Sequence, residues 1–418
     1  MIDLIVRGDE RDIAVEDGLI AGIAPEIDEP AREEIDARGL HVLPGALDAH
    51  VHFNDPGRAD WEGWATGTAA LAAGGATACA EMPLNAHPPT VDGAAFDAKV
   101  AAATGRAAVD FALWGGLVPG DLDRLDELAG RGVVGFKAFM CGSGIEDFQA
   151  VDDDVLGAGM RRAATLGLPV AVHAERPSEL RAPRDGSWQE WAASRPPAAE
   201  LSAIERALEL AEETGCSLHV VHVSIADGVA AVAEARRRGV DASCETCPHY
   251  LVLRAADMQR LGTLAKCAPP LRDDPEALWA QLEHVTLVAS DHSPCPPAMK
   301  AGGFDTAWGG IAGAQTTLAL LLGEGVRRGL PLAGLADLVT GAPARRFGLR
   351  KGRLEPGADA DLALVELPAD HELGELHDRH RANPFAGRRL GARVVRTLLR
   401  GRTGRHGRLL VPERKDPE

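Results

Sequence analysis

The chain has 418 residues, of which 45% are hydrophobic and 25% are charged, a composition typical of a soluble globular protein with a proper core. Its formal net charge of −18 argues against nucleic acid or an anionic membrane as the main partner, because both favour basic surfaces. The first residues form no apolar signal core, no apolar run is long enough to cross a bilayer, and the seven cysteines are scattered. We therefore expect a cytoplasmic protein without a disulfide framework.

Short strands and turns are predicted for the first 44 residues, where Asp17 and Gly18 mark a tight hairpin. A similar texture returns near the other end of the chain, in "KGRLEPGADADLALVEL" and "ARVVRTLLRG". Segments far apart in sequence but alike in pattern are expected to pair. We predict that residues 1–44 and 345–418 form one small composite β-sandwich domain.

Between these ends, apolar runs alternate with amphipathic helices. The helix predicted from residue 201 places Ile204 and Leu208 on one face and ends at Gly215. Short buried strands that alternate with helices indicate parallel βαβ units. No dinucleotide-binding fingerprint follows the first strand, which argues against an open doubly wound sheet. The α/β fold class predicted for residues 45–344 is therefore a (β/α)8 TIM-type barrel.

Four histidines and an aspartate stand where apolar runs end. In "DAHVHF", His50 and His52 are two residues apart and would point to the same side of a strand. His173 ends "LPVAVH", His222 ends "SLHVVH" and Asp291 ends "VTLVASD". A single HxH pair is most often two polar side chains on a barrel rim. Because a barrel gathers the carboxyl ends of its strands at one mouth, the whole set predicts a metal site there.

Lys137 lies inside the apolar run "VVGFKAFM", where burying a bare ammonium costs several kcal/mol. One interpretation is a lysine whose ammonium reaches the rim or pairs with an acid. The interpretation that we favour is a neutral amine, with its pKa depressed by burial, that adds carbon dioxide. The resulting carbamate is a carboxylate that can bridge two cations. With the four histidines and the aspartate it would complete a two-metal site.

These motifs resemble those of the amidohydrolase superfamily, within the group of cyclic amidases that holds dihydroorotases, hydantoinases and allantoinases. The matching stretches run in order over most of the chain and are most similar to the allantoinase group. They include "PGALDAHVHFNDPGR", "EMPLNAHPPT", "GFKAFMCGSGIEDF", "CETCPHYLVL", "LAKCAPPLR" and "SDHSPCPPAMK". The resemblance implies a barrel with a composite β-sandwich, a homotetramer, and a small-molecule substrate, allantoin, that is opened to allantoate.

The resemblance also implies which residues hold metal. Two divalent ions per chain are expected, with zinc as the default and cobalt, manganese or iron as alternatives. Carbon dioxide would carboxylate Lys137, which bridges the two ions, and a water between them would supply hydroxide. Asp291 would also accept and deliver the proton. The six implied ligands are His50, His52, Lys137, His173, His222 and Asp291.

Substrate contacts are predicted less directly. Asn54 stands two residues after the second metal histidine, where dihydroorotases place an arginine that grips the substrate carboxylate, so Asn54 disfavours dihydroorotate. A turn before Asp55 and Pro56 is the alternative reason for this asparagine. Residues 181–200 form either a mobile lid or a surface excursion. Asn85 and Ser293 are expected contacts as well, and the backbone around Cys267 and Ala268 is expected to contribute through its main-chain groups.

Two other functions stay open. A hydantoinase, a dihydropyrimidinase or a dihydroorotase would use the same chemistry on another cyclic amide. A scaffold of the same fold would have lost the metal ligands and the catalysis with them. The presence of all six ligand positions argues against the scaffold.

Overall fold

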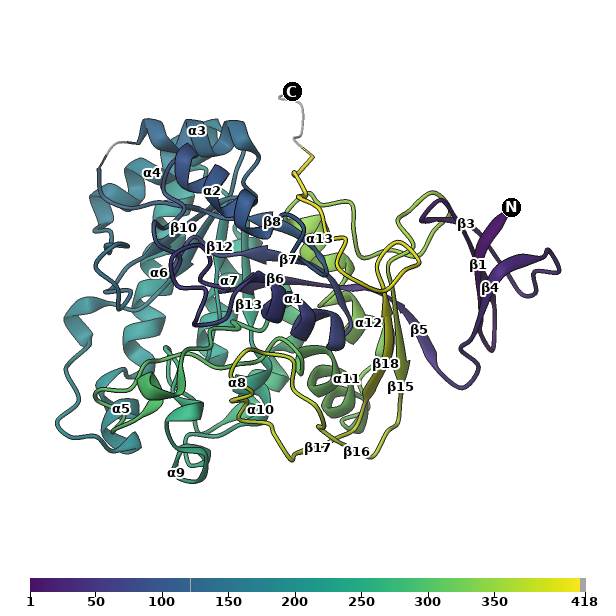
Figure 1. The fold of residues 1–418 in the computed structure, drawn as a ribbon. Coiled ribbons are helices and arrows are strands. Elements are labelled where there is room, and N and C mark those ends of the chain that lie inside the picture. Colours follow the sequence, from purple (N-terminus) through teal and green to yellow (C-terminus); the bar gives the residue numbers. More distant parts are fainter. Residues whose placement is uncertain (121, 414–418) are drawn as a thin grey trace.

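The structure is a computed structural model that describes residues 1–120 and 122–413 (Figure 1). Its centre is built from parallel strands in two hydrogen-bonded groups, one in the order β6-β7-β8 and the other in the order β14-β13-β12-β11-β10-β9. These strands are β6 (Ala46–Val51), β7 (Ala76–Glu81), β8 (Asp110–Leu113), β9 (Gly115–Gly116), β10 (Phe136–Phe139), β11 (Val170–His173), β12 (Leu218–Val220), β13 (Ala242–Thr246) and β14 (Leu287–Val288).

The two groups join into a closed barrel. On one side, a single residue separates β8 from β9, so one run of chain pairs with β7 at its start and with β10 at its end. On the other side, His292, which follows β14, pairs in parallel with Val51 of β6, and the His52 amide donates to the His292 carbonyl at 2.8 Å. Counting β8 and β9 together, eight strand positions surround the barrel, which confirms the predicted fold class.

Helices follow each strand position and cover the outside of the barrel (Figure 1). The helix predicted from residue 201 is present, and it ends where Gly215 adopts a left-handed φ of 68°. The α-helices of the described residues are α1 (Trp64–Ala73), α2 (Gly93–Ala103), α3 (Asp123–Arg131), α4 (Asp153–Thr165), α5 (Trp188–Ser194), α6 (Pro197–Thr214), α7 (Ala226–Arg237), α8 (Pro248–Val252), α9 (Asp257–Leu261), α10 (Pro275–Ala280), α11 (Thr317–Arg327), α12 (Leu332–Asp337) and α13 (Gly341–Arg346).

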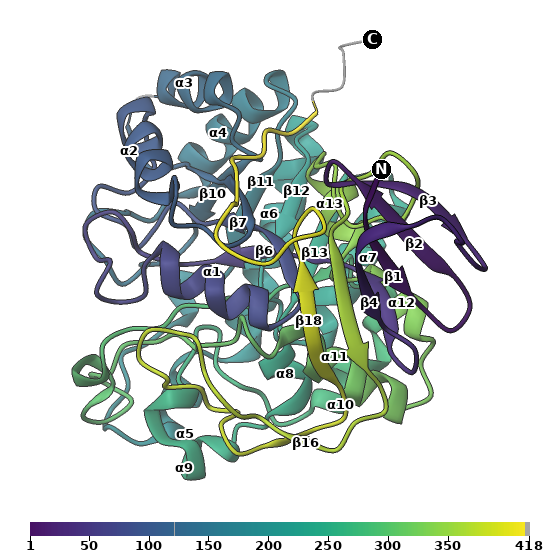
Figure 2. The same cartoon turned by 45° about the vertical axis from the view of Figure 1, so that its right-hand side comes forward.

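Two further sheets lie beside the barrel and are built from both ends of the chain (Figure 2). One has the order β3-β2-β1-β4, and the Asp17-Gly18 hairpin between β2 and β3 is confirmed, with both residues at positive φ. In the other, β5 from the N-terminal part pairs with β15, which pairs with β18. The strands are β1 (Ile2–Arg7), β2 (Asp12–Glu16), β3 (Leu19–Ala24), β4 (Ala31–Asp36), β5 (His41–Pro44), β15 (Leu362–Glu366) and β18 (Arg393–Leu398).

The two sheets share one apolar core. Leu4, Val15 and Ile20 of the first sheet belong to the same buried cluster as Leu362 and Leu398 of the second. The segments are thus joined as the composite β-sandwich that the sequence predicts. The domain limits at residues 44 and 345 stay a prediction, and residues 121 and 414–418 within them lie outside the described residues.

The chain between β15 and β18 leaves the sandwich and returns along the barrel. It includes the short pair β16 (His371–Glu372) and β17 (Arg389–Leu390). The Arg379 amide donates to the Glu62 carboxylate at 3.2 Å, and His380 Nε2 donates to the Asp60 carbonyl at 2.7 Å. This segment therefore supports the loop between β6 and α1.

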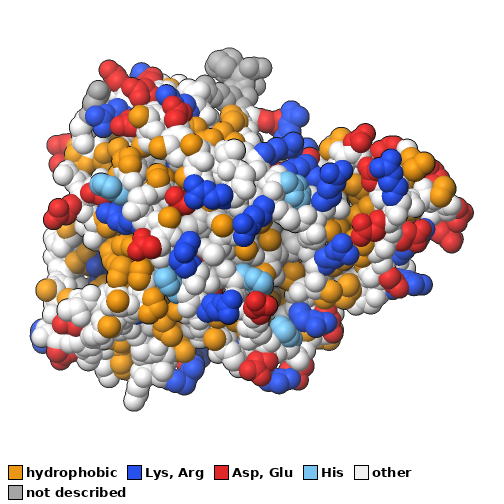
Figure 3. Space-filling model, in the orientation of Figure 1, with side chains coloured by type: hydrophobic (Ala, Val, Ile, Leu, Met, Phe, Trp, Pro, Cys, Tyr) orange, Lys and Arg blue, Asp and Glu red, His pale blue; other side chains and the backbone are white. Residues whose placement is uncertain are grey.

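The surface carries charged side chains of both signs. Acidic and basic side chains are interspersed over the face in Figure 3. Within residues 1–120 and 122–413, no helix combines the length and the apolar character needed to span a membrane.

Candidate active site

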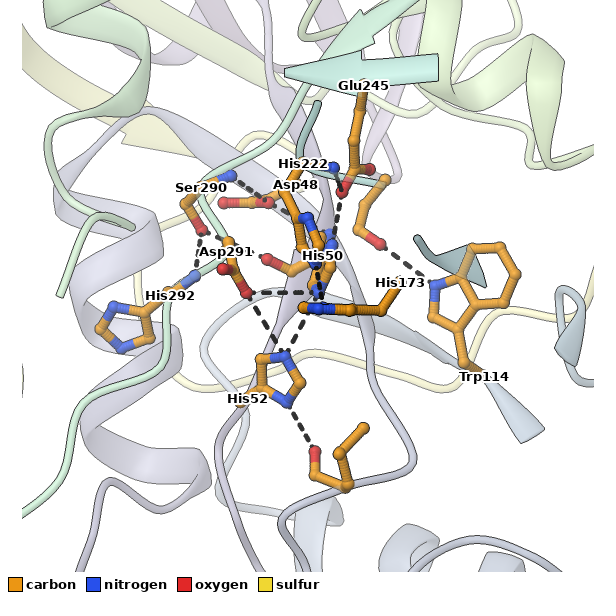
Figure 4. Close-up of polar contacts among 12 residues, drawn as sticks. Asp48, His50, His52, Trp114, His173, His222, Glu245, Ser290, Asp291 and His292 are labelled. Carbon is orange, nitrogen blue, oxygen red and sulfur yellow. Dashed lines mark hydrogen bonds and ion pairs between the residues drawn. The ribbon is translucent and has the colours of Figure 1, made fainter. Parts of the chain in front are cut away.

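One cluster lies at the carboxyl end of β6. His50 belongs to β6 and His52 follows it, and their Nε2 atoms are 3.2 Å apart. Asp291 follows β14, and its Oδ1 lies 3.3 Å from His50 Nε2 and 3.5 Å from His52 Nε2 (Figure 4). The two ring nitrogens and the carboxylate oxygen thus face one point. All three side chains are nearly or fully buried.

A second pair lies next to the first. His173 ends β11 and His222 follows β12, and His173 Nδ1 lies 3.1 Å from His222 Nε2. The rings of His50 and His222 are 5.4 Å apart between centroids, so the two clusters are neighbours (Figure 4). The structure therefore brings together the four histidines and the aspartate that the sequence singled out.

Lys137 lies in β10, which is next to β11 in the barrel, and its side chain is fully buried. Its Nζ has no hydrogen-bond partner among the residues that the structure describes, and it lies 4.9 Å from the ring centroid of Phe139. Burial lowers the pKa of this amine to about 8, and the nearby carboxylates of Glu245 and Asp291 only partly offset that effect. Among the described residues no acid forms an ion pair with Lys137, so the alternative interpretation of an acid-paired lysine does not hold.

This arrangement fits divalent cations. Two nitrogen ligands at about 2.0–2.1 Å from a tetrahedral ion are about 3.3 Å from each other, close to the spacing within both histidine pairs. Burial lowers the pKa values of His50, His173 and His222, which favours the neutral imidazoles that bind metal. The unpartnered Lys137 nitrogen supplies the place where a bridging carboxylate could be built.

Glu245 of β13 supports one histidine of each pair, His50 and His222. It accepts hydrogen bonds from His50 Nδ1, from His219 Nε2 at 3.0 Å and from the His222 amide at 3.2 Å. Burial works to raise the pKa of this carboxyl, but the His50 and His219 rings outweigh burial and hold it well below its usual value. Because Nδ1 of His50 is occupied, its Nε2 is the ring nitrogen that is left available to a metal. His52 is fixed in the same way, since its Nδ1 lies 2.6 Å from the Leu84 carbonyl.

Glu175 has the corresponding role for His173. Its Oε2 lies 2.7 Å from His173 Nε2, which leaves His173 Nδ1 to face His222. Arg195 donates to both oxygens of this carboxylate, with 3.0 Å between Nε and Oε1. Burial opposes ionisation, but His173 and Arg195 outweigh it and hold the pKa of Glu175 at about 2.

The sequence interpretation missed both glutamates. Glu175 stands in the "HAE" motif, two residues after a predicted ligand, and Glu245 is an acid inside an apolar strand. An acid close after a predicted ligand, or an acid within an apolar strand, is the sequence signal that could have identified these two glutamates.

Three residues of this site have left-handed backbone conformations. The φ angles are 62° for Asn54, 40° for His222 and 48° for Asp291. Such conformations cost about 1 to 3 kcal/mol each for residues other than glycine and concentrate at functional sites. His222 and Asp291 adopt these conformations just after β12 and β14 end, where their side chains join the cluster.

A cavity of about 380 Å³ opens above the cluster. Its floor includes His50, His52, His173, His222 and Asp291. Of the predicted substrate contacts, Asn85, Ala268 and Ser293 line it.

Asn54 and Cys267 are buried and do not line this cavity. Asn54 Oδ1 accepts from the backbone and side-chain nitrogens of Asn85, each at 3.2 Å, so Asn54 positions a residue of the cavity wall. The Cys267 carbonyl accepts from Trp191 Nε1 at 3.1 Å. Its thiol is packed in the core.

The segment 181–200 contributes a wall of the cavity, because Trp191 of α5 and Arg195 beyond it both line the space. Lys266 and Trp308 line it too. These four side chains were not among the predicted contacts. No sequence periodicity relates them, so only the tertiary structure shows that they meet.

The barrel, the histidines and the aspartate at its strand ends and the cavity above them define a metal-dependent hydrolase of the barrel class. The model of the "Amidohydrolase family" matches residues 41–404. The chain therefore belongs to the amidohydrolase family, whose members work with two metal ions.

Curated relatives match along nearly the whole chain. A protein named allantoinase from Rubrobacter xylanophilus is 56% identical, over 100% of this chain and 99% of its own. One of the same name from Solibacter usitatus is 51% identical, over 96% of this chain and 93% of its own. Among solved structures, the L-hydantoinase (dihydropyrimidinase) from Arthrobacter aurescens has a TM-score of 0.94 at 34% identity, covering 98% of this chain and 100% of its own. These similarities place the chain among the cyclic amidases of the family.

Proposed function

We propose that this chain hydrolyses the hydantoin-ring amide of allantoin to give allantoate. The observation that carries this proposal is the identity of 45% to 56% with proteins named allantoinase from several bacteria, over 93% or more of this chain. In the reaction, water adds to the ring carbonyl carbon and the bond from that carbon to the ring nitrogen breaks. The nitrogen takes up a proton and the carbon becomes the carboxylate of the open-chain product.

The two histidine pairs are proposed to hold two divalent ions, with zinc as the preferred ion and cobalt, manganese or iron as alternatives. His50, His52 and Asp291 would hold one ion, and His173 and His222 the other. The short nitrogen-to-nitrogen distances within both pairs support this assignment.

Lys137 is proposed to be carboxylated and to bridge the ions. Its neutral amine attacks carbon dioxide, a nitrogen–carbon bond forms, and one proton is released to leave a carbamate anion. The buried position, the absence of a hydrogen-bond partner among the described residues and the pKa of about 8 support this proposal, because a fraction of the amine is neutral near pH 7.

When bound, the ions lower the pKa of water and polarise the ring carbonyl. The chain's own residues handle the proton and the substrate. Asp291 accepts the proton of the attacking water at the carboxylate oxygen that does not face His50 and His52, and delivers it to the departing ring nitrogen. Burial works to raise the pKa of Asp291, but His50 and His52 outweigh it and keep the carboxylate ionised and ready to accept. Asn85, Ala268 and Ser293 are proposed to contact the ring, since all three line the cavity.

A second candidate function is hydrolysis of hydantoin or dihydrouracil. The similarity to the L-hydantoinase (dihydropyrimidinase) structure, at a TM-score of 0.94, favours it as the alternative. Its 34% identity is lower than that of the proteins named allantoinase.

The setting of the enzyme is part of the proposal. We place it in the cytoplasm as a homotetramer, with residues 1–44 and 345–418 as the sandwich domain and residues 45–344 as the barrel. The scattered cysteines, all seven of them buried and unpaired, support a reducing compartment.

A substrate panel tests this function. Metal-loaded enzyme in bicarbonate buffer would be given allantoin, hydantoin, dihydrouracil and dihydroorotate, and each open-chain product would be measured. We expect the highest kcat/KM for allantoin, and loss of that activity in Lys137→Ala. The exposed Arg260→Ala is the matched control for a lost cation and should leave activity unchanged. A higher kcat/KM for any other ring would reject the proposal.

A further inference from the structure

Lys266 is an unusual cation in the wall of the cavity. The residue is only 4% exposed, and its Nζ lies 4.2 Å from the ring centroid of Trp191. The ammonium donates to the Ala307 carbonyl, which is its one hydrogen bond within residues 1–120 and 122–413. An ammonium carries three N–H donors, so two remain for a ligand in the cavity.

Lys300, on the neighbouring loop, shows what a structural lysine looks like here. Its Nζ donates to the carbonyls of Thr263 at 3.1 Å, Trp308 at 3.0 Å and Gly310 at 2.6 Å, so its donors are fully used. Lys300 does not line the cavity, whereas Lys266 does. The contrast indicates that Lys266 is placed to donate to something in the cavity.

The charges around Lys266 select the kind of group that it can receive. The charges that shift its pKa, besides burial, are those of Arg195 and Asp305, and both residues also line the cavity. Arg195 is already paired with the buried carboxylate of Glu175. The wall therefore offers one ammonium with free donors beside the exposed carboxylate of Asp305. This combination suits a neutral group that has both a carbonyl oxygen and an amide N–H.

The position of Lys266 relative to the predicted ring contact suits a ring substituent. Lys266 and Ala268 are two residues apart in sequence, and both line the cavity. A ring held at Ala268 therefore has Lys266 in the same wall, where a substituent on the ring could reach it.

We propose that Lys266 and Asp305 form a subsite for the ureido substituent of the substrate and that this subsite selects allantoin over unsubstituted cyclic amides. The inference rests on the proposed allantoin hydrolysis. Lys266 donates to the ureido carbonyl, Asp305 accepts from the terminal amide, and Trp191 holds the ammonium in place. A substrate carboxylate, as in dihydroorotate, would accept from Lys266 but would also lie beside the like charge of Asp305, which a neutral ureido group avoids.

The test compares selectivity in Lys266→Met, Asp305→Asn and wild type. For each protein, kcat/KM for allantoin is divided by kcat/KM for hydantoin. If hydantoin is bound but not turned over, the competitive inhibition constant of hydantoin is compared with KM for allantoin instead. We expect Lys266→Met to lower the ratio about 10- to 100-fold, the loss of one charge-assisted hydrogen bond. Asp305→Asn alters an exposed side chain and should lower the ratio several-fold without affecting folding.

The control is Arg260→Met, which removes an exposed cation outside the cavity and should leave the ratio unchanged. A ratio that stays at the wild-type value in both Lys266→Met and Asp305→Asn, while allantoin is still hydrolysed, would overturn the subsite and leave the proposed function standing. A larger loss for dihydroorotate than for allantoin in Lys266→Met would assign the lysine to a carboxylate and overturn it too. Failure of the wild type on allantoin would reject the function itself.

Discussion

Glu245→Gln is the change that isolates the support beneath the metal ligands. The carboxylate accepts three hydrogen bonds, from His50 Nδ1, His219 Nε2 and the His222 amide, and one of its oxygens serves two of them. Glutamine has the same shape but only one oxygen. Whichever way its amide is turned, an NH2 group faces at least one of these donors.

The structure sets the size of the expected effect. A buried donor left without a partner costs about 1 to 3 kcal/mol, so the metal-free protein should lose about that much unfolding free energy. His50 would also lose the carboxylate that fixes its tautomer and raises its basicity. Removing such an outer partner typically weakens metal binding about 10- to 100-fold.

The assay is competition for zinc between the protein and a chromophoric chelator, with urea unfolding of the metal-free protein measured in parallel. Asp110→Asn is the matched control, because Asp110 is equally buried and paired with Lys351 at 2.7 Å but lies at the start of β8, away from the ligands. It should lower stability and leave zinc affinity unchanged. Unaltered zinc affinity in Glu245→Gln would show that Glu245 does not support zinc binding through His50.

Four other predictions concern separate parts of the molecule. Lys137→Ala should bind fewer than two ions per chain, as metal analysis would show. Its activity in a product assay should fall by more than about 100-fold, the upper end of the loss caused by removing a residue that only supports a metal ligand. Asp291→Asn should lower kcat about 100- to 10,000-fold, measured with saturating metal, because it can no longer carry the proton. Burial lowers the pKa of Lys266 to about 8, so its ammonium is charged below that pH and neutral above it, and KM for allantoin should rise between pH 7 and pH 9 in wild type but not in Lys266→Met. Lys351→Met removes the cation that contacts three carboxylates at 2.7 Å each, and urea unfolding should show a loss of about 3 to 5 kcal/mol.

The sequence predicted the floor of the site because the relevant signal is local. His173 and Asp291 each follow an apolar run, and a parallel barrel places all such positions at one mouth. Lys137 was recognisable for the same reason, since a lysine within an apolar strand conflicts with its surroundings. The convergence of these side chains at one mouth therefore follows from strand periodicity and fold class together.

The walls could not be predicted in this way, because side-chain direction in loops has no period. Asn54 was expected to contact substrate, but it is fully buried behind the cavity wall, where its Oδ1 accepts from Asn85. Cys267 is adjacent to Ala268, yet only Ala268 lines the cavity, since neighbouring residues of an irregular segment point in different directions. Trp191 joins the wall from 76 residues away in sequence, a contact that only the tertiary structure reveals.

Whether the site needs two metal ions and carbon dioxide can be measured by titrating metal-free protein with zinc. Zinc would be added in bicarbonate buffer, and the rate of allantoate formation from allantoin would be plotted against the number of ions bound per chain. We expect activity to rise to a maximum at two ions per chain and to require bicarbonate after the protein has been stripped of carbon dioxide. Full activity with one ion, or two bound ions without allantoate formation, would contradict this expectation.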